Sequence, residues 1–146
     1  MKKLLYLLFV ITLLGCGSDD NDNASAQSFL EKYDGYIWVE EESKRPDFSS
    51  LLQFSNSPKS YMFVDKFDGS GYCNPYNIDN ILENAGDTLI FELTDGNTFV
   101  ITANAIDGGE SIRMKCIFKD ENTPGQDGST YWDIVYTRTS ESLGCQ

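Results

Sequence analysis

The chain has no histidine, and its 146 residues carry only 11 lysines and arginines against 23 aspartates and glutamates. Without histidine, the Ser-His-Asp and Cys-His catalytic arrangements and all histidine metal sites are excluded. The formal charge of −12 argues against a nucleic-acid partner, because phosphate backbones are bound by clusters of lysine and arginine. Phosphate-binding glycine loops and Cys-x-x-Cys motifs are also missing from the sequence.

Carboxylates are the remaining catalytic candidates. Glu40, Glu41 and Glu42 are consecutive, and Asp133 lies far along the chain. Glycoside hydrolysis needs two carboxyl groups that face one another across the substrate. Adjacent residues on a strand point to opposite faces, so the glutamate run does not supply such a pair. We interpret it as the solvated end of a strand, and we expect no enzymatic activity, no metal and no cofactor.

Long apolar runs are scarce, and the longest uncharged one is Leu4–Leu14. It is too short to cross a bilayer, which takes about 20 helical residues. Lys2 and Lys3 precede it, and Leu13-Leu14-Gly15-Cys16 ends it. A basic start, a short apolar stretch and a small-residue end are typical of a secretory signal. The sequence therefore predicts a signal peptide over residues 1–15.

The Leu-Leu-Gly-Cys ending resembles the lipobox of bacterial lipoproteins. The resemblance implies cleavage before Cys16 and acylation of this cysteine, with palmitate as an expected acyl group. Each buried methylene of such chains adds about 0.8 kcal/mol, so several chains anchor a protein stably to a membrane. The alternative is a plain cleaved signal with an incidental cysteine.

Residues 16–27 are polar and acidic, and they read as a flexible tether with nothing to bury. The run Ser18-Asp19-Asp20 resembles the surface-export signal of lipoproteins in the Bacteroidetes. That resemblance implies an outer-membrane lipoprotein whose domain faces the outside of the cell. An ordinary solvated linker, which leaves the domain in the periplasm, is the alternative.

A single domain over residues 28–146 is expected to begin with a short helix. Ser28 and Glu31 have the spacing of a capping box, and Gly35 lies where a helix stop is expected. The apolar face of this helix comprises Ala26, Phe29, Leu30 and Tyr33.

After Gly35 the apolar residues recur at every second position, which predicts strands. The eight predicted strands are Tyr36–Glu41, Leu51–Ser55, Ser60–Lys66, Asn80–Glu83, Asp87–Leu93, Thr98–Ala105, Ser111–Lys119 and Tyr131–Thr139. Asp95-Gly96 and Asp107-Gly108-Gly109 mark hairpin turns. Between the strands fall Pro46, Pro58, Pro75 and Pro124. This order predicts an all-β, eight-stranded antiparallel up-and-down barrel, because closure removes exposed edges.

Alternation also predicts which side chains point into the barrel. The large inward residues, which are candidates to line a ligand cavity, are Phe91, Phe99, Met114, Phe118 and Trp132. The other inward residues are Leu89, Leu93, Ile101, Ala103, Ile112, Cys116, Ile134 and Tyr136. A barrel of this size either holds one small ligand or is filled by side chains, and residues this large favour filling. The outer face is apolar at Ile90, Val100, Ile117 and Val135, and we expect the N-terminal helix to cover part of it.

Gly35-Tyr36-Ile37-Trp38 in the first strand and Tyr136-Thr137-Arg138 in the last resemble the lipocalin-like domains of small bacterial lipoproteins. That family combines a short helix, a Gly-x-Trp motif, eight up-and-down strands and an arginine in the last strand. The resemblance implies that Trp38 packs beneath Arg138 and closes the barrel floor, with a cation–π contact of about 0.5–2 kcal/mol. The spacing here is Gly-x-x-Trp, so either the glycine is only the helix stop or the first strand begins differently. The alternative treats Trp38 and Trp132 as plain core aromatics.

Three cysteines remain after Cys16, and an oxidising compartment favours one disulfide and one free thiol among three possible pairings. Cys116 alternates with apolar strand residues, which predicts a buried thiol. We favour Cys73–Cys145, which would pin the C-terminal tail across the barrel as terminal cysteines do in many lipocalins. Cys73–Cys116 is the rival pairing.

These features predict a monomeric, membrane-anchored binding module that holds a small apolar or amphipathic ligand without chemistry. The alternative is an interaction protein that uses its loops to contact a protein or glycan while the barrel serves as scaffold. Its candidate contacts are the long loop Lys119–Thr130 and a polar-aromatic patch around Pro75, made by Tyr72, Asn74 and Tyr76.

Overall fold

The computed structural model describes residues 27–95, 97–119 and 128–145. The predicted signal peptide, Cys16 and nearly all of the tether lie outside the described residues. Most of the predicted long loop, with Pro124, lies outside them too. Within the described ranges, no helix is both long and apolar enough to span a membrane.

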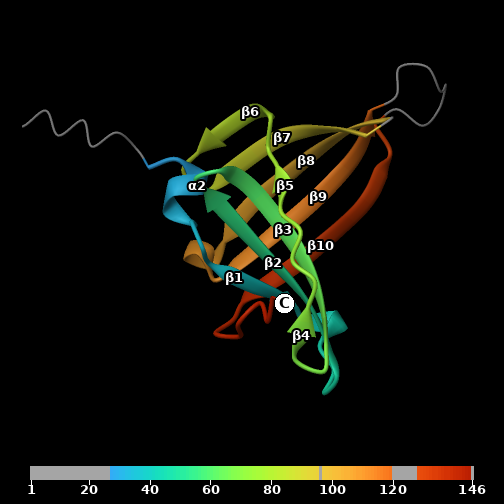
Figure 1. The fold of residues 1–146 in the computed structure, drawn as a ribbon. Helices are drawn as coiled ribbons and strands as arrows, with labels where there is room; N and C mark the ends of the chain where they lie inside the picture. Colours follow the sequence, from blue (N-terminus) through green and yellow to red (C-terminus); the bar gives the residue numbers. More distant parts are fainter. Residues whose placement is uncertain (1–26, 96, 120–127, 146) are drawn as a thin grey trace, which may run out of the picture.

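The domain is one antiparallel β-sheet that carries a single short α-helix (Figure 1). In chain order its elements are α2 (Phe29–Lys32), β1 (Ile37–Glu40), the 3₁₀ turn η2 (Glu41–Ser43), β2 (Phe48–Asn56), β3 (Lys59–Phe67), β4 (Ser70–Gly71), β5 (Tyr76–Asn77), β6 (Asn80–Ala85), β7 (Thr88–Asp95), β8 (Asn97–Ile106), η3 (Asp107–Gly109), β9 (Ser111–Lys119) and β10 (Thr130–Arg138). Neighbouring strands follow the order β4-β3-β2-β1-β10-β9-β8-β7-β6, and β5 pairs with β3. The antiparallel all-β class and its sequential order are therefore confirmed.

All eight predicted strands are present, with boundaries that shift by up to three residues. The turn at Asp107–Gly109 is a 3₁₀ turn in which all three residues have positive φ angles, the property that the Asp-Gly-Gly sequence predicts. Two short strands, β4 and β5, were not predicted. Each has only two residues, which is too short for alternation to show, and they lie in a stretch rich in glycine and asparagine.

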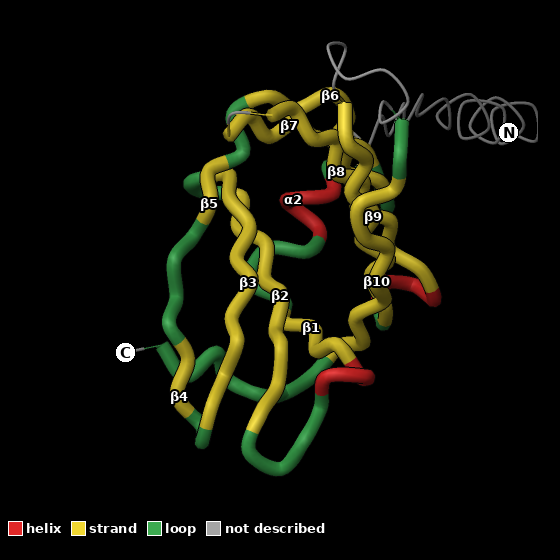
Figure 2. The backbone as a smooth tube through the Cα atoms, turned by 90° about the vertical axis from the view of Figure 1, so that its right-hand side faces the viewer, coloured by secondary structure: helices red, strands yellow, loops and turns green. Residues whose placement is uncertain are grey.

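The sheet curls strongly around its interior but is not closed into a barrel (Figure 2). Its hydrogen-bonded path ends at β6 on one side and at β4 and β5 on the other, and only Ile78 and Asp79 separate β5 from β6. Side-chain packing spans this seam, because Ile78 is buried and the Tyr61 ring lies 5.2 Å from the Phe91 ring. An open, curled sheet of ten strands therefore stands where a closed eight-stranded barrel was predicted.

The helix α2 begins at the predicted capping box. The Ser28 hydroxyl accepts a hydrogen bond from the Glu31 amide, and the Ser28 amide donates to the Glu31 carboxylate. The Ser28 amide and hydroxyl both donate to the Glu31 carboxylate, and these two bonds stabilise its ionised form and lower the pKa of Glu31. The Leu30 amide also donates to the Asn84 side chain of β6 at 3.0 Å, which ties the helix to the edge of the sheet. The helix therefore has both a local and a tertiary reason to form.

The helix packs against the inner face of the sheet, not the outer face that was expected (Figure 2). Phe29 and Leu30 are fully buried in the main core, and the Phe29 ring lies edge-on to Phe54 of β2 at 5.3 Å. Val135 on the outer face stays exposed. The physical reason is the size of the helix. A helix of one turn buries Phe29 and Leu30 completely inside the end of the curled sheet, whereas on the outer face it would leave part of them in water.

A second, smaller core lies on the outer face of β1, β2 and β3. Val39, Leu51 and Val64 are buried there, and Leu143 of the C-terminal tail packs against them. The tail therefore covers the apolar outer face of β1, β2 and β3.

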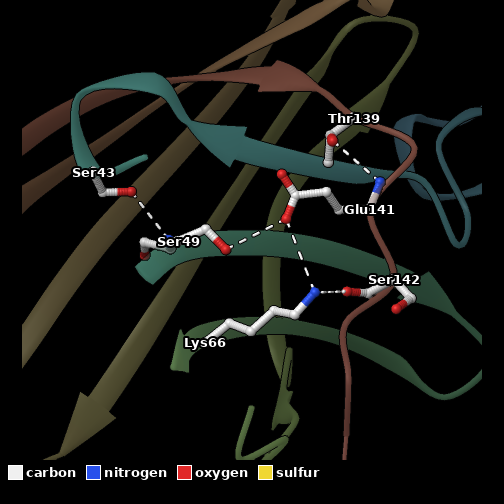
Figure 3. Close-up of polar contacts among 7 residues, drawn as sticks. Ser43, Ser49, Lys66, Thr139, Glu141 and Ser142 are labelled. Atoms are coloured by element: carbon white, nitrogen blue, oxygen red, sulfur yellow. Dashed lines mark hydrogen bonds and ion pairs between the residues drawn. The ribbon is translucent and has the colours of Figure 1, made fainter. Parts of the chain in front are cut away.

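Polar contacts fix the tail in this position (Figure 3). Lys66 Nζ of β3 donates to the Ser142 carbonyl oxygen at 2.9 Å and lies 3.9 Å from the Glu141 carboxylate. Glu141 also accepts a hydrogen bond from the Ser49 hydroxyl of β2 at 3.5 Å. The tail thus contacts two adjacent strands before it reaches Cys145.

Candidate functional site

The structure joins Cys73 to Cys145 by a disulfide and leaves Cys116 free and buried. This is the favoured pairing of the sequence analysis, and the rival pairing is wrong. The Gly71 amide donates to the Gly144 carbonyl oxygen at 2.9 Å, so backbone pairing continues up to the bridge. Closing a loop of 72 residues stabilises a fold by about 4–5 kcal/mol on the chain-entropy model. The bridge is a structural device that holds the tail over the outer core.

Trp38 and Arg138 lie directly opposite one another on β1 and β10, as the family resemblance implies. The guanidinium carbon of Arg138, however, lies 4.0 Å from the ring centre of Tyr36, and Tyr36 in turn lies 6.0 Å from Trp38. Tyr36 is the additional residue in the Gly-x-x-Trp spacing, and it occupies the place beneath the arginine. The expected contact of Arg138 with Trp38 is therefore a contact with Tyr36.

Trp38 is fully buried at the helix end of the sheet. Its indole Nε1 donates to the Gly109 carbonyl oxygen at 3.2 Å, and its ring lies 6.1 Å from both Tyr33 and Phe54. These contacts leave this end of the interior packed.

The predicted cavity residues divide into two groups. Phe91 and Met114 are fully buried within the main core. This part of the interior is filled, as large inward side chains favour. Phe118 is partly buried and packs against Phe99, with ring centres 5.5 Å apart. Phe99 and Trp132 line a pocket.

That pocket lies away from α2, where β7 and β9 end and β8 and β10 begin, and it has a volume of about 260 Å³. We call it the aromatic pocket. It is lined by Tyr61, Phe63, Tyr76, Leu93, Phe99, Ile101, Cys116, Tyr131 and Trp132. None of these side chains is charged at neutral pH, and burial raises the pKa values of Tyr61 and of the Cys116 thiol. The lining therefore suits an apolar or aromatic molecule.

Ring-to-ring contacts build the walls of the aromatic pocket. Tyr76 stacks on Tyr61 at 5.4 Å, Tyr61 meets Phe63 edge-on at 5.4 Å, and Phe63 meets Trp132 at 6.0 Å. Tyr131 packs against Phe99 at 5.6 Å on the other wall and is 70 % exposed. Each such pair adds about 0.5–1.5 kcal/mol beyond area burial, so the walls are held in place without a ligand.

Tyr61 and Phe63 were missed because β3 is apolar on both faces. Met62 and Val64 alternate with them and pack against the outer core beneath the tail. A strand buried on both faces carries no contrast that could assign its residues to one face. The sequence placed Tyr76 only in the polar-aromatic patch around Pro75, because the two-residue strand β5 was not predicted.

A polar groove of about 440 Å³ adjoins the aromatic pocket and shares Tyr61, Tyr76 and Leu93 with it. Its remaining lining consists of Asn77, Asp79, Asn80, Glu92 and Thr94. The Glu92 carboxylate is bound by Lys119 at 2.9 Å and by the Asn80 side-chain amide. Residues of β3, β5, β6 and β7 line the polar groove, which lies at the seam between β5 and β6.

The structure does bring Glu40, Glu41, Glu42 and Asp133 to the rim of one hollow of about 320 Å³. Both oxygens of Asp133 are held by Arg113 at 2.8 Å, which lowers the pKa of this carboxyl. Burial and the nearby carboxylates of Glu42 and Asp65 raise the pKa of Glu40. In the described ranges, no group of three acidic or cysteine side chains is arranged to hold a metal ion.

Comparison of the chain with protein-family models, curated proteins and solved structures gives no significant match. The geometry of the molecule itself therefore carries the functional argument. Its uncharged, largely aromatic hollow is the aromatic pocket, which adjoins the polar groove.

Proposed function

We propose that this protein is a membrane-anchored, non-catalytic binding module that holds a small apolar or amphipathic ligand in the aromatic pocket. The single observation that carries the proposal is the uncharged, largely aromatic lining of that pocket at the end remote from α2. Ligand sites are typically concave and apolar, with a few polar groups that set orientation. The polar groove supplies such groups at the mouth.

The membrane anchor is the second part of the proposal. The basic start, the apolar stretch and the Leu-Leu-Gly-Cys ending support lipidation of Cys16 and attachment to the outer membrane, with the domain facing outward. Metabolic labelling with an alkyne analogue of palmitate tests it. We expect label on the wild-type chain and none on the Cys16→Ser variant, whereas label on both excludes acylation at this residue.

A lipocalin-like origin of the fold belongs to the same proposal. The helix before β1, the sequential strand order and the antiparallel pairing of β1 with β10 support it. The unclosed seam between β5 and β6 departs from that plan.

Calorimetric titration of the full chain in phosphatidylcholine vesicles with 2-naphthalenemethanol tests the binding function. This neutral bicyclic probe matches the apolar lining of the pocket. We expect one equivalent to bind with a negative heat-capacity change, because apolar surface is removed from water on binding. Empty vesicles provide the blank for partition into lipid.

The matched variants are Leu93→Glu and Leu82→Glu. Leu93 lines the aromatic pocket, whereas Leu82 is an exposed leucine on β6 outside it. A carboxylate at Leu93 is expected to abolish binding, and one at Leu82 to leave it unchanged. Equal heats for wild type and Leu93→Glu, with both chains folded by circular dichroism, would show that the probe does not occupy this pocket.

The interaction-protein alternative is favoured by one specific observation, which is the exposure of two tyrosines near the seam. Tyr72 is 81 % exposed and Tyr76 is 50 % exposed, and exposed tyrosines are enriched at protein interfaces. Tyr72 lies outside the aromatic pocket, so Tyr72→Ala separates the two functions. Loss of partner capture from the host's own surface extract, with probe binding intact, would support the alternative.

A further inference from the structure

We propose that the aromatic pocket and the polar groove form one composite site for an amphipathic ligand with a cationic head, a primary amine or a quaternary ammonium. The apolar part lies in the pocket and the head lies in the groove. The inference rests on the proposed function, since the pocket has to accept the apolar part. It adds the charge class of the ligand.

The two hollows adjoin one another at the seam. They share Tyr61, Tyr76 and Leu93, and the stacked rings of Tyr61 and Tyr76 stand at the boundary with an interplanar angle of 21°. A molecule whose rings lie between Phe99 and Trp132 can therefore extend past Tyr76 into the groove. The groove has the larger volume, about 440 Å³ against 260 Å³, which leaves room for a solvated head.

The charge of the groove determines which head group binds there. Of the residues that line the groove, only Asp79 and Glu92 are charged, and both are negative. Lys119 compensates Glu92 through a 2.9 Å ion pair. Across the described ranges, Asp79 forms no ion pair with a cationic side chain, so the groove keeps one uncompensated carboxylate. The net charge of −12 adds a long-range attraction for cations.

An aromatic face strengthens the same preference. Half of Tyr76 is exposed at the boundary, and a cation against the face of a tyrosine ring gains a cation–π contact. A neutral hydroxylated head could bind the amides of Asn77 and Asn80, but it would gain nothing from the carboxylate of Asp79. An anionic head would be repelled. The groove therefore favours a cation.

Three probes with one ring system and different heads test the inference: 2-naphthylmethylammonium, 2-naphthalenemethanol and 2-naphthoate. The readout is protection of Cys116 against N-ethylmaleimide in the full chain in phosphatidylcholine vesicles, followed by mass spectrometry of the modified peptide. Cys116 lines the pocket, so an occupied pocket shields it. We expect the ammonium to protect at about tenfold lower concentration than the alcohol, with the carboxylate weakest.

The matched variants remove the same charge at two places. Asp79→Asn removes the carboxylate from the groove, and Asp47→Asn removes an exposed one that lines a different hollow. We expect Asp79→Asn to cut the preference for the ammonium several-fold with the alcohol unchanged, and Asp47→Asn to preserve it. Raising the salt concentration is expected to weaken ammonium binding alone.

The outcomes separate this inference from the proposed function. Equal protection by the ammonium and the alcohol, or tighter binding of the carboxylate, overturns the cationic head and leaves the pocket as a binding site. Protection by the ammonium that persists fully in Asp79→Asn overturns the assigned groove. Failure of all three probes to protect Cys116 overturns both proposals.

Discussion

The Arg138 guanidinium lies 4.0 Å from the ring centre of Tyr36, while Trp38, directly opposite Arg138 in the sheet, lies one ring further in. Arginine, tyrosine and tryptophan thus form a layered end to the core. A cation over an aromatic face adds about 0.5–1 kcal/mol at exposed sites.

The Tyr36 ring is therefore expected to stabilise the fold through its face and not through its hydroxyl. Tyr36→Leu should lower the free energy of unfolding by about 1 kcal/mol, and Tyr36→Phe by less than about 0.5 kcal/mol. Urea denaturation of the two variants, of Arg138→Gln and of the Tyr36→Leu/Arg138→Gln double variant measures the coupling. Strict additivity of the single changes would mean that the contact contributes nothing.

Position 109 requires glycine because the Tyr33 ring leaves no room for a side chain there. A Cβ at Gly109 would lie 2.5 Å from the Tyr33 ring, and the φ of Gly109 is +94°. Gly109→Ala is expected to cost more than about 2 kcal/mol, because a buried ring has to move and the backbone is strained. Gly108→Ala is the control, since Gly108 also has a positive φ but open space around it. It should cost only about 1–2 kcal/mol, and equal losses of thermal stability would contradict the steric role of Tyr33.

The disulfide is expected to hold the tail over the outer core. Cys145→Ser should lower the free energy of unfolding by about 2–5 kcal/mol and speed hydrogen exchange in β3, where Lys66 and Val64 contact the tail. Leu143→Ala should cost less, because it removes one partly buried side chain and leaves the bridge intact. An unchanged exchange pattern in the reduced protein would show that the tail stays in place without the bridge.

Acid stability is expected to depend on Asp87, which links α2 to β7. Its carboxylate accepts hydrogen bonds from Lys32 Nζ at 2.7 Å and from the Tyr33 hydroxyl at 2.5 Å, and these bonds lower its pKa below the usual 3.8. A lowered folded-state pKa adds stability that is present above the unfolded-state value and is lost as the pH falls through the folded-state value. Asp87→Asn should therefore be less stable than wild type at pH 6, and the difference should shrink below about pH 3.8. Melting temperatures across this range measure it, and a constant difference would exclude the linkage.

Some features of the fold could be predicted from the sequence and others could not. The capping box at Ser28 and the eight longer strands follow from local spacing and turn chemistry. The Cys73–Cys145 pairing was favoured, with Cys73–Cys116 left open, on the buried strand pattern of Cys116 and the family resemblance. The position of α2 inside the sheet could not be predicted, because an apolar face on a helix indicates that this face is buried but does not indicate which element covers it.

The candidate site was only half predictable for a related reason. Phe99 and Trp132 are inward by alternation, and they line the pocket. Phe91 and Met114 are inward too, yet neighbouring side chains fill the space around them. Whether an inward residue faces a hollow depends on packing across the sheet, which no single strand encodes. The seam likewise depends on β5, which is too short to leave a pattern.

The accessibility of Cys116 tests the central claim most directly. Cys116 is 3 % exposed and lines the aromatic pocket, and burial raises the pKa of its thiol. We predict slow modification by N-ethylmaleimide at pH 7, faster modification as the pH rises, and a rate that falls at least severalfold when 2-naphthalenemethanol saturates the full chain in vesicles. A modification rate that is the same with and without the probe, up to its solubility limit, would contradict the claim that this pocket binds small apolar molecules.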